Sequence, residues 1–489
     1  MIDKDLLSIQ EARALVRSAR SAQEAFAQLD QSRVDAVIKA IVDEAKVQAQ
    51  SLATMAVDET GFGKVEDKKT KNILASEKLY EHIRDMKTMG VLKEDTANKI
   101  VEIAVPMGVI AGIIPSTNPT STTIYKSIIA LKSGNAIVFT PHPSAKECIS
   151  KTVEMIRGVL SRCGVSEDLV SVMCVPSIQG STELMKIVDL ILATGGPGMV
   201  KAAYSSGTPA LGVGAGNVPV FIERSADIDD ALDKIFASKT FDNGTVCASE
   251  QAIVTEAVIA DQVKAALRVK GGYFLTGDDL EKVKRVMERP NGAMNPKIVG
   301  RDAAYIAQLA GIQIPAGTRL LVCEEEGVGP QYPFSKEKLT ALIGFYTVAD
   351  WKQACELCHA LLKNGGIGHS LGIHSKNEEV IREFGMKKPV SRMLVNTPTT
   401  HGAVGITTNL FPSFTLGCGT VGGSATSDNV TPLHLMNIRR VAYDLGNLDV
   451  KGSGSAACTA SAGSNIDSMD VEALTGMIMD HLKKLASAN

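Results

Sequence analysis

The sequence has 489 residues, a mass of 51.7 kDa and a formal net charge of −3 at pH 7. A chain of this length is expected to fold into two or three domains. Its pI near 6.3 provides no basic field for nucleic acid or an anionic membrane. It contains no run of about 20 apolar residues to span a bilayer, and its start lacks the apolar core of a signal peptide. We therefore expect a cytoplasmic protein.

The nine cysteines are an odd number scattered through a large chain. This pattern is typical of free thiols in a reducing compartment rather than of a disulfide framework. One apparent motif, the C-x-x-C-H of haem attachment at 355–359, lies where apolar residues recur at helical spacing. We interpret it as core cysteines on an amphipathic helix and predict no metal site.

Residues 5–98 are predicted to be helical scaffold that carries no chemistry. Residues 5–50 read as two helices, and residues 51–98 as charged helical segments broken at 61–63 and at Gly90. Residues 99–114 are rich in β-forming side chains and run into a polar loop that contains Asn118, ahead of a helix over 124–131. Loops that follow strands in βα units carry binding groups, so Asn118 is a candidate site residue. The alternative is a turn asparagine bonded to its own backbone.

From residue 136 onward, short apolar runs alternate with helical patterns. Strands are predicted at 136–139, 170–175 and 190–194, with helices at 145–163 and 180–186. This alternation indicates a parallel, doubly wound sheet. The third strand is followed by the glycine-rich turn 194–201. This turn either binds a pyrophosphate at a helix N-terminus or is only a tight turn. A strand interrupted by glycines is predicted at 209–222.

Cys247 lies in a turn of small residues after Asn243-Gly244 and before an apolar run. A thiol with no bulky neighbours is sterically free to meet a substrate, whereas a structural cysteine more often lies inside an apolar run. We therefore interpret Cys247 as a nucleophile. A second series of strands and helices follows it up to residue 396, which predicts a second domain. Clefts between domains are common ligand sites.

Several long motifs follow one another between about residues 8 and 445: PSTNPTS at 115–121, FTPHP at 139–143, ATGGPGMVKAAY at 193–204, GVGAGN at 212–217, KTFDNGTVCASEQ at 239–251, GGIGH at 365–369 and LGCG at 416–419. In this order they resemble the aldehyde dehydrogenase superfamily, most closely its coenzyme A-acylating branch. The resemblance implies an α/β fold with a Rossmann-type cofactor domain, an α/β catalytic domain and a small β oligomerisation arm. The expected division is 1–244 for cofactor binding, with arm strands near 99–114, then 245–410 for the catalytic thiol domain and 411–450 for the return segment and arm.

The resemblance also implies roles for individual residues. Cys247 would attack an aldehyde as a thiolate, and the Asn118 amide with the Cys247 backbone N–H would hold the oxyanion. Hydride transfer to NAD would leave a thioester on Cys247. The implied cofactor-binding residues are Pro115, Ser116, Thr140, His142, Pro143, Thr194, Gly195, Gly198, Val213, Gly214 and Glu337. At Glu337 the pattern departs from the family, because Thr340-Ala341 replaces the usual small residue and proline.

Val213 stands where hydrolytic members of the superfamily carry a glutamate that activates water. Valine cannot act as a general base. We therefore expect the thioester to react with the thiol of coenzyme A, which is more acidic than water, rather than with water. His369 could accept a thiol proton at neutral pH, although a histidine at the start of a strand can equally be structural. The predicted reaction converts a short-chain aldehyde, NAD and coenzyme A to acyl-CoA and NADH. The alternatives are a hydrolytic aldehyde dehydrogenase and a catalytically idle cargo protein.

The end of the sequence changes in composition. Residues 451–465 contain no large apolar side chain and are expected to form a flexible linker, and residues 466–489 an amphipathic helix. This helix resembles the peptides that target enzymes into bacterial microcompartments, which implies shell proteins as partners and a location inside such a compartment. The alternative is a helix that packs back on its own oligomer. A homodimer or homotetramer is implied by the family. The aldehyde stays open among acetaldehyde, propionaldehyde and sulfoacetaldehyde.

Overall fold

The computed structural model describes residues 3–289, 292 and 294–445 of the chain. The predicted linker at 451–465 and targeting helix at 466–489 lie outside these residues. No helix among the described residues is both long and apolar enough to cross a membrane.

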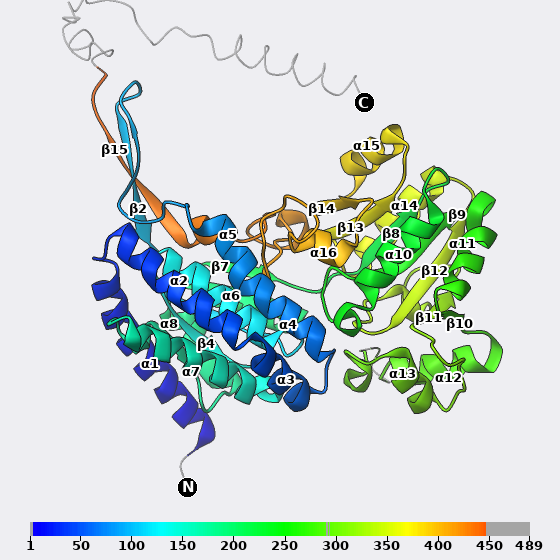
Figure 1. The fold of residues 1–489 in the computed structure, drawn as a ribbon, viewed down its shortest axis with the longest axis horizontal. Coiled ribbons are helices and arrows are strands. Elements are labelled where there is room, and N and C mark those ends of the chain that lie inside the picture. The colour runs from blue at the N-terminus through cyan, green and yellow to red at the C-terminus, as the bar shows by residue number, and fades with distance from the viewer. Residues whose placement is uncertain (1–2, 290–291, 293, 446–489) are drawn as a thin grey trace, which may run out of the picture. The chain divides into compact units, whose positions relative to one another are not determined.

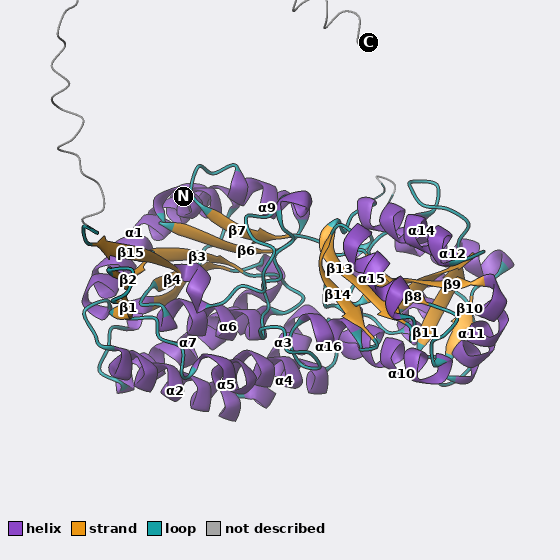
Figure 2. Ribbon diagram, turned by 90° about the horizontal axis from the view of Figure 1, so that it is seen from above, coloured by secondary structure: helices purple, strands orange, loops and turns teal. Residues whose placement is uncertain are grey.

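The N-terminal part is helical, as predicted, over most of its length. It comprises α1 (Lys4–Phe26), α2 (Gln31–Val47), α3 (Ala49–Thr60), α4 (Val65–Ile73) and α5 (Leu79–Ile83), with a π-helical segment between α4 and α5. The apolar stripe of α2 is buried, which explains why this face forms a helix: its side chains recur every three or four residues. α2 and α4 pack against α6 (Pro119–Lys132), so they form an outer layer beyond it (Figure 2).

The prediction of helix up to residue 98 was wrong at its end. Val91–Asp95 form β1, which pairs antiparallel with β2 (Ile100–Pro106), and β15 (Met436–Ala442) joins the other side of β2 (Figure 1). The backbone partners that β2 supplies outweigh the weak local preference of this charged segment. The predicted β region 99–114 is therefore divided: β2 lies in this three-stranded sheet, and β3 (Val109–Ile113) lies in a different sheet.

A parallel five-stranded sheet has the order β5-β4-β3-β6-β7. Its other strands are β4 (Ala136–Thr140), β5 (Val170–Val172), β6 (Leu190–Thr194) and β7 (Ala210–Val213). The helices that connect them are α6, α7 (Lys146–Arg162), α8 (Ile178–Ile187) and α9 (Pro197–Tyr204). Figure 2 shows helices on both faces of this sheet, as the continuous apolar strands predicted. The strand order changes direction between β3 and β6, which is the topological switch point of a doubly wound sheet.

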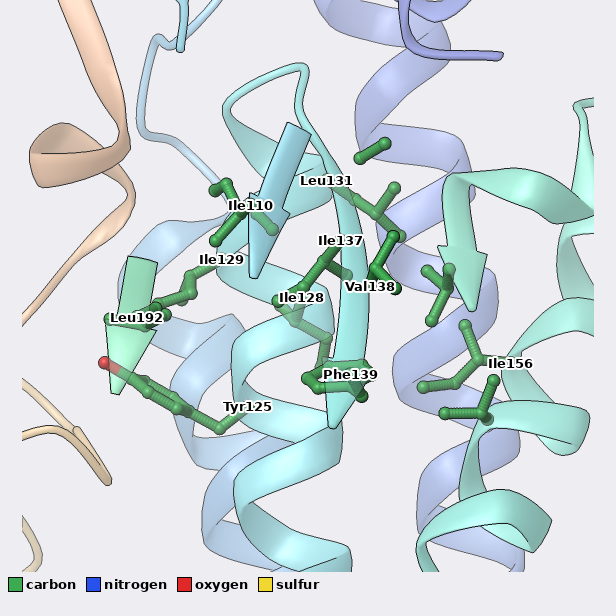
Figure 3. Packing of buried hydrophobic residues seen from close by; sticks show 14 of the residues in the cluster. Ile110, Tyr125, Ile128, Ile129, Leu131, Ile137, Val138, Phe139, Ile156 and Leu192 are labelled. Carbon is green, nitrogen blue, oxygen red and sulfur yellow. The ribbon is translucent and has the colours of Figure 1, made fainter. Parts of the chain in front are cut away.

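The core of this part lies between the strands and their helices. Ile110, Ile137 and Phe139 from the strands are fully buried together with Ile128 and Ile129 of α6 (Figure 3). Burying one such side chain contributes about 1.5–3 kcal/mol. The closely packed core therefore holds the ends of these strands, from which the loops begin, in place.

A parallel seven-stranded sheet has the order β10-β11-β12-β9-β8-β13-β14. Successive side chains of its central strands alternate between two apolar clusters, with Val220 in one and Phe221 in the other. One cluster contains residues of α10–α13 and the other residues of α14 and α15. The strands are β8 (Val218–Ile222), β9 (Glu250–Glu256), β10 (Gly272–Phe274), β11 (Leu320–Glu324), β12 (Leu342–Val348), β13 (Gly368–His374) and β14 (Val390–Val395); the helices are α10 (Ile228–Lys239), α11 (Ala257–Val269), α12 (Gly277–Met287), α13 (Ala303–Ala310), α14 (Trp351–Lys363), α15 (Glu378–Lys387) and α16 (Thr399–Ala403).

Residues 209–222 are not the single interrupted strand that the sequence predicted. They form β7 and β8, which belong to different sheets, and residues 214–217 connect the two. Gly216 is needed here because a Cβ atom would lie 2.1 Å from the carbonyl oxygen of Cys247. The change of sheet therefore falls before the predicted boundary at 244/245. The assignment of cofactor binding and catalysis to separate domains stays a prediction.

The C-x-x-C-H segment lies in α14, where Cys355 and Cys358 are buried. The prediction of core cysteines on an amphipathic helix is confirmed.

Candidate active site

A cavity of about 460 Å³ lies at the carboxyl ends of β3, β4 and β6. It is lined by residues of the loops that follow these strands and by parts of the chain around residues 214, 247 and 337. Eleven of the predicted site residues line it: Pro115, Ser116, Asn118, Thr140, His142, Pro143, Thr194, Gly195, Gly214, Cys247 and Glu337. Gly198, Val213 and His369 are not among the lining residues.

The place of the cavity fits a dinucleotide. It borders the switch point between β3 and β6, where doubly wound sheets bind nucleotides, and α9 begins beside it with Gly196 at its N-cap. The two strands are bridged by Lys126, whose Nζ donates to the carbonyl oxygens of Ile113 and Leu192, each at 2.8 Å. Burial lowers the pKa of Lys126 well below its ordinary value. This side chain therefore links β3 and β6 near their carboxyl ends, where the loops of the cavity begin.

The thiol of Cys247 lies beside an imidazole. Cys247 is half-buried, and its Sγ lies 3.1 Å from His369 Nε2, while His369 Nδ1 lies 3.0 Å from Ser370 Oγ. Burial, and then the positive charge of Arg392, lower the pKa of His369 to about 3. Burial, and then the carboxylate of Glu337, raise the pKa of Cys247 to about 12. At neutral pH the resting pair is therefore a neutral thiol and a neutral imidazole.

Arg392 is a functional candidate that the sequence did not reveal. This buried side chain on β14 donates to the carbonyl oxygens of Gly417, of Ser427 at 3.0 Å and of His369 at 3.4 Å. Its Nε has no hydrogen-bond partner among the described residues. The guanidinium lowers the pKa of Cys247. The signal in the sequence was an arginine directly before the short apolar run Met393-Leu394-Val395.

Glu337 lies in the same cavity as the thiol. Its Oε1 accepts a hydrogen bond from the backbone N–H of Gly216 at 3.0 Å. Burial raises the pKa of Glu337 to about 7, although the Gly216 hydrogen bond acts in the opposite direction. Glu337 is the only carboxylate among the described residues that line the cavity. It can therefore be either charged or neutral near pH 7.

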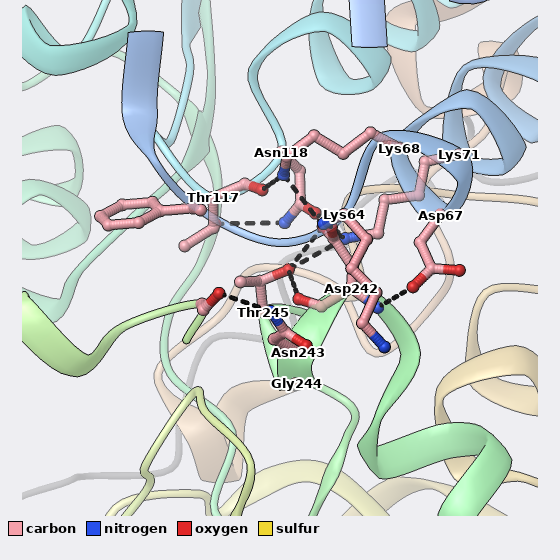
Figure 4. A network of polar contacts seen from close by, with 12 residues as sticks. Lys64, Asp67, Lys68, Lys71, Thr117, Asn118, Asp242, Asn243, Gly244 and Thr245 are labelled. Atoms are coloured by element: carbon pink, nitrogen blue, oxygen red, sulfur yellow. Dashed lines mark hydrogen bonds and ion pairs between the residues drawn. The ribbon is translucent and has the colours of Figure 1, made fainter. Parts of the chain in front are cut away.

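Asn118 is held by a buried network of charges that the sequence analysis missed (Figure 4). Lys71 Nζ donates to Asn118 Oδ1 at 2.6 Å, to Thr245 Oγ1 at 3.1 Å and to Asp242 Oδ2. Lys68 Nζ donates to Asp242 Oδ2 at 2.9 Å and to the carbonyl oxygen of Thr117 at 3.0 Å. Both lysines lie on α4, within the segment that was predicted to carry no chemistry. Their spacing of three residues, which places both on one helix face, was the available signal.

Val213 does not reach the cavity. It is buried at the end of β7 in a cluster with Val246, Leu416 and Cys418, which packs behind the thiol. His142 does line the cavity, and its Nδ1 accepts a hydrogen bond from the backbone N–H of Ser144 at 3.2 Å.

Comparisons with known proteins show which family the chain is similar to. A model of the aldehyde dehydrogenase family matches residues 6–309. The bifunctional aldehyde-alcohol dehydrogenase AdhE of Escherichia coli (strain K12) is 44% identical over 448 residues, which are 90% of this chain and 50% of that protein. The chain thus spans about half the length of this curated relative. An acetylating aldehyde dehydrogenase structure from Geobacillus thermoglucosidasius is 48% identical with a TM-score of 0.89, covering 91% of this chain and 99% of that one.

Two more distant structures carry further information. A propionaldehyde dehydrogenase from the Clostridium phytofermentans fucose utilisation bacterial microcompartment is 29% identical, with a TM-score of 0.80 over 88% of this chain and 97% of that one. A propionaldehyde dehydrogenase of Rhodopseudomonas palustris, described with bound CoA and an acylated cysteine, is 27% identical, with a TM-score of 0.78 over 88% of this chain and 97% of that one. These matches confirm the predicted fold class. A thiol, an amide and a switch-point cavity in this fold, together with a family model that covers more than half of the sequence, establish that the chain belongs to the aldehyde dehydrogenase family.

Proposed function

We propose that the protein oxidises a short-chain aldehyde to acyl-CoA, with NAD as hydride acceptor and coenzyme A as acyl acceptor, through a thioester on Cys247. The observation that carries this proposal is the contact of 3.1 Å between Cys247 Sγ and His369 Nε2 at a cavity that Asn118 also lines. The names of the relatives, acetylating in one case and CoA-bound with an acylated cysteine in another, support the acyl transfer.

The first step forms a bond between the sulfur of Cys247 and the carbonyl carbon of the aldehyde. The thiol proton passes to His369 Nε2, and the Asn118 amide with the Cys247 backbone N–H stabilises the oxyanion. Because the resting pair is neutral, this proton transfer is coupled to formation of the carbon–sulfur bond. The loops around Ser116, Thr140 and Gly195 would hold a dinucleotide at the switch point, and this group would supply the hydride acceptor as the carbonyl re-forms. His369 then releases its proton to solvent, and Cys247 carries a thioester.

The second step transfers the acyl group. The thiol of coenzyme A attacks the thioester carbon and gives its proton to His369, and the oxyanion again forms at Asn118. Collapse of this intermediate breaks the bond to Cys247, whose sulfur takes the proton back from His369. Acyl-CoA leaves with the free thiol restored, and each turnover releases one proton, which His369 passes to solvent.

Hydrolysis is the second candidate, and the position of Glu337 favours it. A carboxylate beside a thioester can activate water as a general base, which Val213 cannot do. The Gly216 N–H occupies one oxygen of Glu337 and opposes this role. Water is also a far weaker nucleophile than a thiol, so we expect acyl transfer to be faster.

The test is a stopped assay of NADH and acyl products with acetaldehyde, propionaldehyde and sulfoacetaldehyde, with and without coenzyme A. We expect sustained NADH formation and acyl-CoA only when coenzyme A is present, and at most one NADH per Cys247 without it. An unchanged rate and a free acid without coenzyme A would establish the hydrolytic enzyme. The Cys247→Ala variant is the control, since residual turnover in it would exclude a Cys247 thioester.

We further propose a homo-oligomer that is cargo of a bacterial microcompartment. β15 supports the first part, because it is an edge strand among the described residues and exposes Ile438 and Val441. The amphipathic pattern of residues 466–489 and the microcompartment origin of one relative support the second. Removal of residues 451–489 should abolish co-sedimentation with shell proteins and leave aldehyde oxidation intact. Unchanged co-sedimentation would contradict the proposed docking.

A further inference from the structure

Two buried ammonium groups share one buried carboxylate beside the active-site cavity. Lys68 and Lys71 of α4 are each 2% exposed. Asp242 is fully buried and lies near the start of the segment 240–249 that carries Cys247, here called the thiol loop. Their ion pairs join residues 174 and 171 positions apart in the sequence. Burying charged groups costs desolvation free energy, and replacing a buried ion pair with apolar side chains of similar volume often leaves a protein equally or more stable. These ion pairs are therefore weakly explained by stability alone. The geometry around Lys71 suggests a further purpose.

Every N–H of the Lys71 ammonium has an acceptor. The three acceptors are Asn118 Oδ1, Asp242 Oδ2 and Thr245 Oγ1. An ammonium group has three donors and no acceptor, so the Asn118 atom that faces it must be the oxygen of the amide. The amide nitrogen therefore faces away from Lys71. One of its hydrogens goes to Thr117 Oγ1 at 3.1 Å, and the second is left for a ligand in the cavity that Asn118 lines.

We propose that Lys71 is a positioning residue that locks the Asn118 side chain in the orientation that presents its N–H to the oxyanion. This inference rests on the proposed function, in which Asn118 stabilises the developing negative charge. Without the lock, the amide can turn over by 180° and present its oxygen, which would repel an oxyanion. An asparagine side chain has two nearly isosteric orientations, so its partners alone decide between them.

Lys71 also fixes the distance between the amide and the thiol. Its contact with Thr245, two residues before Cys247, ties the thiol loop to the loop that carries Asn118. Thr245 Oγ1 in turn donates to Asp242 Oδ2 at 2.7 Å, and the Lys64 backbone N–H donates to Asp242 Oδ1 at 2.7 Å.

The experiment is a double-mutant cycle between Lys71 and Asn118, measured as NADH formation with whichever of acetaldehyde and propionaldehyde the parent oxidises faster. We expect Lys71→Met to lower kcat roughly 10- to 100-fold. A wrongly oriented oxyanion donor can lower kcat by as much as removal of the donor does. KM for NAD should change less than about twofold, because Lys71 lies outside the cavity lining. In an Asn118→Ala background the same change should cost less than about twofold, because no amide remains to be oriented.

Lys132→Met is the matched control. Lys132 is also buried and ion-paired, with Asp35, but lies at the opposite end of α6 from Asn118. We expect it to lower the unfolding temperature without coupling to Asn118. If Lys71→Met does not fold, Lys71→Gln replaces it: its amide can offer either atom to Asn118, so an intermediate loss of kcat is expected. Lys71→Arg, which keeps both donors and charge, should retain more activity than either.

The outcomes separate the two proposals. If Asn118→Ala itself leaves kcat unchanged, the oxyanion role in the proposed function fails. If Asn118→Ala lowers kcat and Lys71→Met lowers it equally in both backgrounds, the lock is wrong while the proposed function stands. A folded Lys71→Met or Lys71→Gln variant with parental kcat would also overturn the lock.

Discussion

The reactivity of Cys247 depends on two residues of opposite charge. Burial raises the pKa of the thiol most, Glu337 raises it further, and Arg392 lowers it. Glu337 itself has a pKa raised to about 7, so its effect on the thiol is present only when it is ionised. The thiolate fraction in the free enzyme therefore depends on the protonation of two groups in one cavity.

Replacing Glu337 with glutamine should make the thiol more reactive, but only above about pH 7. There the wild-type carboxylate is charged and opposes the thiolate, so we expect Glu337→Gln to be alkylated by iodoacetamide about three to ten times faster at pH 8.5. At pH 5.5, where the wild-type carboxyl is protonated, the two rates should agree. Glu325→Gln, a change at a partly buried carboxyl outside the cavity lining, is the control and should show no such difference. Equal rates of wild type and Glu337→Gln at both pH values would contradict this assignment.

The loop between α3 and α4 shows how an element far from the thiol in sequence shapes the site. Gly63 has a φ of +76°, and a Cβ atom there would lie 1.7 Å from Asp242 Oδ1. Asp242 and Asn243 also have left-handed φ values of 48° and 53°. The thiol loop thus adopts its conformation because α4 supplies two ammonium groups and Gly63 leaves room for the carboxylate that they bind.

The Gly63→Ala substitution should therefore break the network around Asp242. We expect a loss of stability of about 3–5 kcal/mol beyond the cost of the left-handed backbone, since a buried ion pair loses its geometry. Gly207→Ala is the matched control: Gly207 has a φ of +87° and no atom within 4 Å of its Cβ position. It should cost about 1–2 kcal/mol. Urea unfolding of both variants measures the difference, and similar values for the two would show that the Asp242 contact contributes little.

At the scale of the whole molecule, the three-stranded sheet has a surface that the described chain does not cover. β15 is an edge of this sheet, with Ile438 40% and Val441 39% exposed. An edge strand with exposed apolar side chains readily pairs with another chain. We attribute this edge to the interface of the proposed homo-oligomer.

Replacing both Ile438 and Val441 with glutamate should dissociate that oligomer to a monomer of 51.7 kDa. The added charges remove apolar contacts and repel the same charges on a second copy. Light scattering with size-exclusion chromatography measures the mass at several concentrations. Val269→Glu, on a residue that is 87% exposed at the end of α11, is the control and should keep the parental mass. An unchanged mass of the double variant would place the interface elsewhere.

The sequence by itself determined the alternation of strands and helices, the parallel sheets and the positions of Cys247 and Asn118. These follow from local signals: apolar period, glycine-rich turns and the motif around a lone thiol. Only the tertiary structure showed that Lys71 contacts Asn118, that the charges of Arg392 and Glu337 shift the pKa of the thiol, and that residues 214–217 cross between sheets. The reason is physical. Each of these features depends on contacts between residues that are far apart in the chain, and the local sequence around one residue does not indicate which distant residue it will contact in the folded protein.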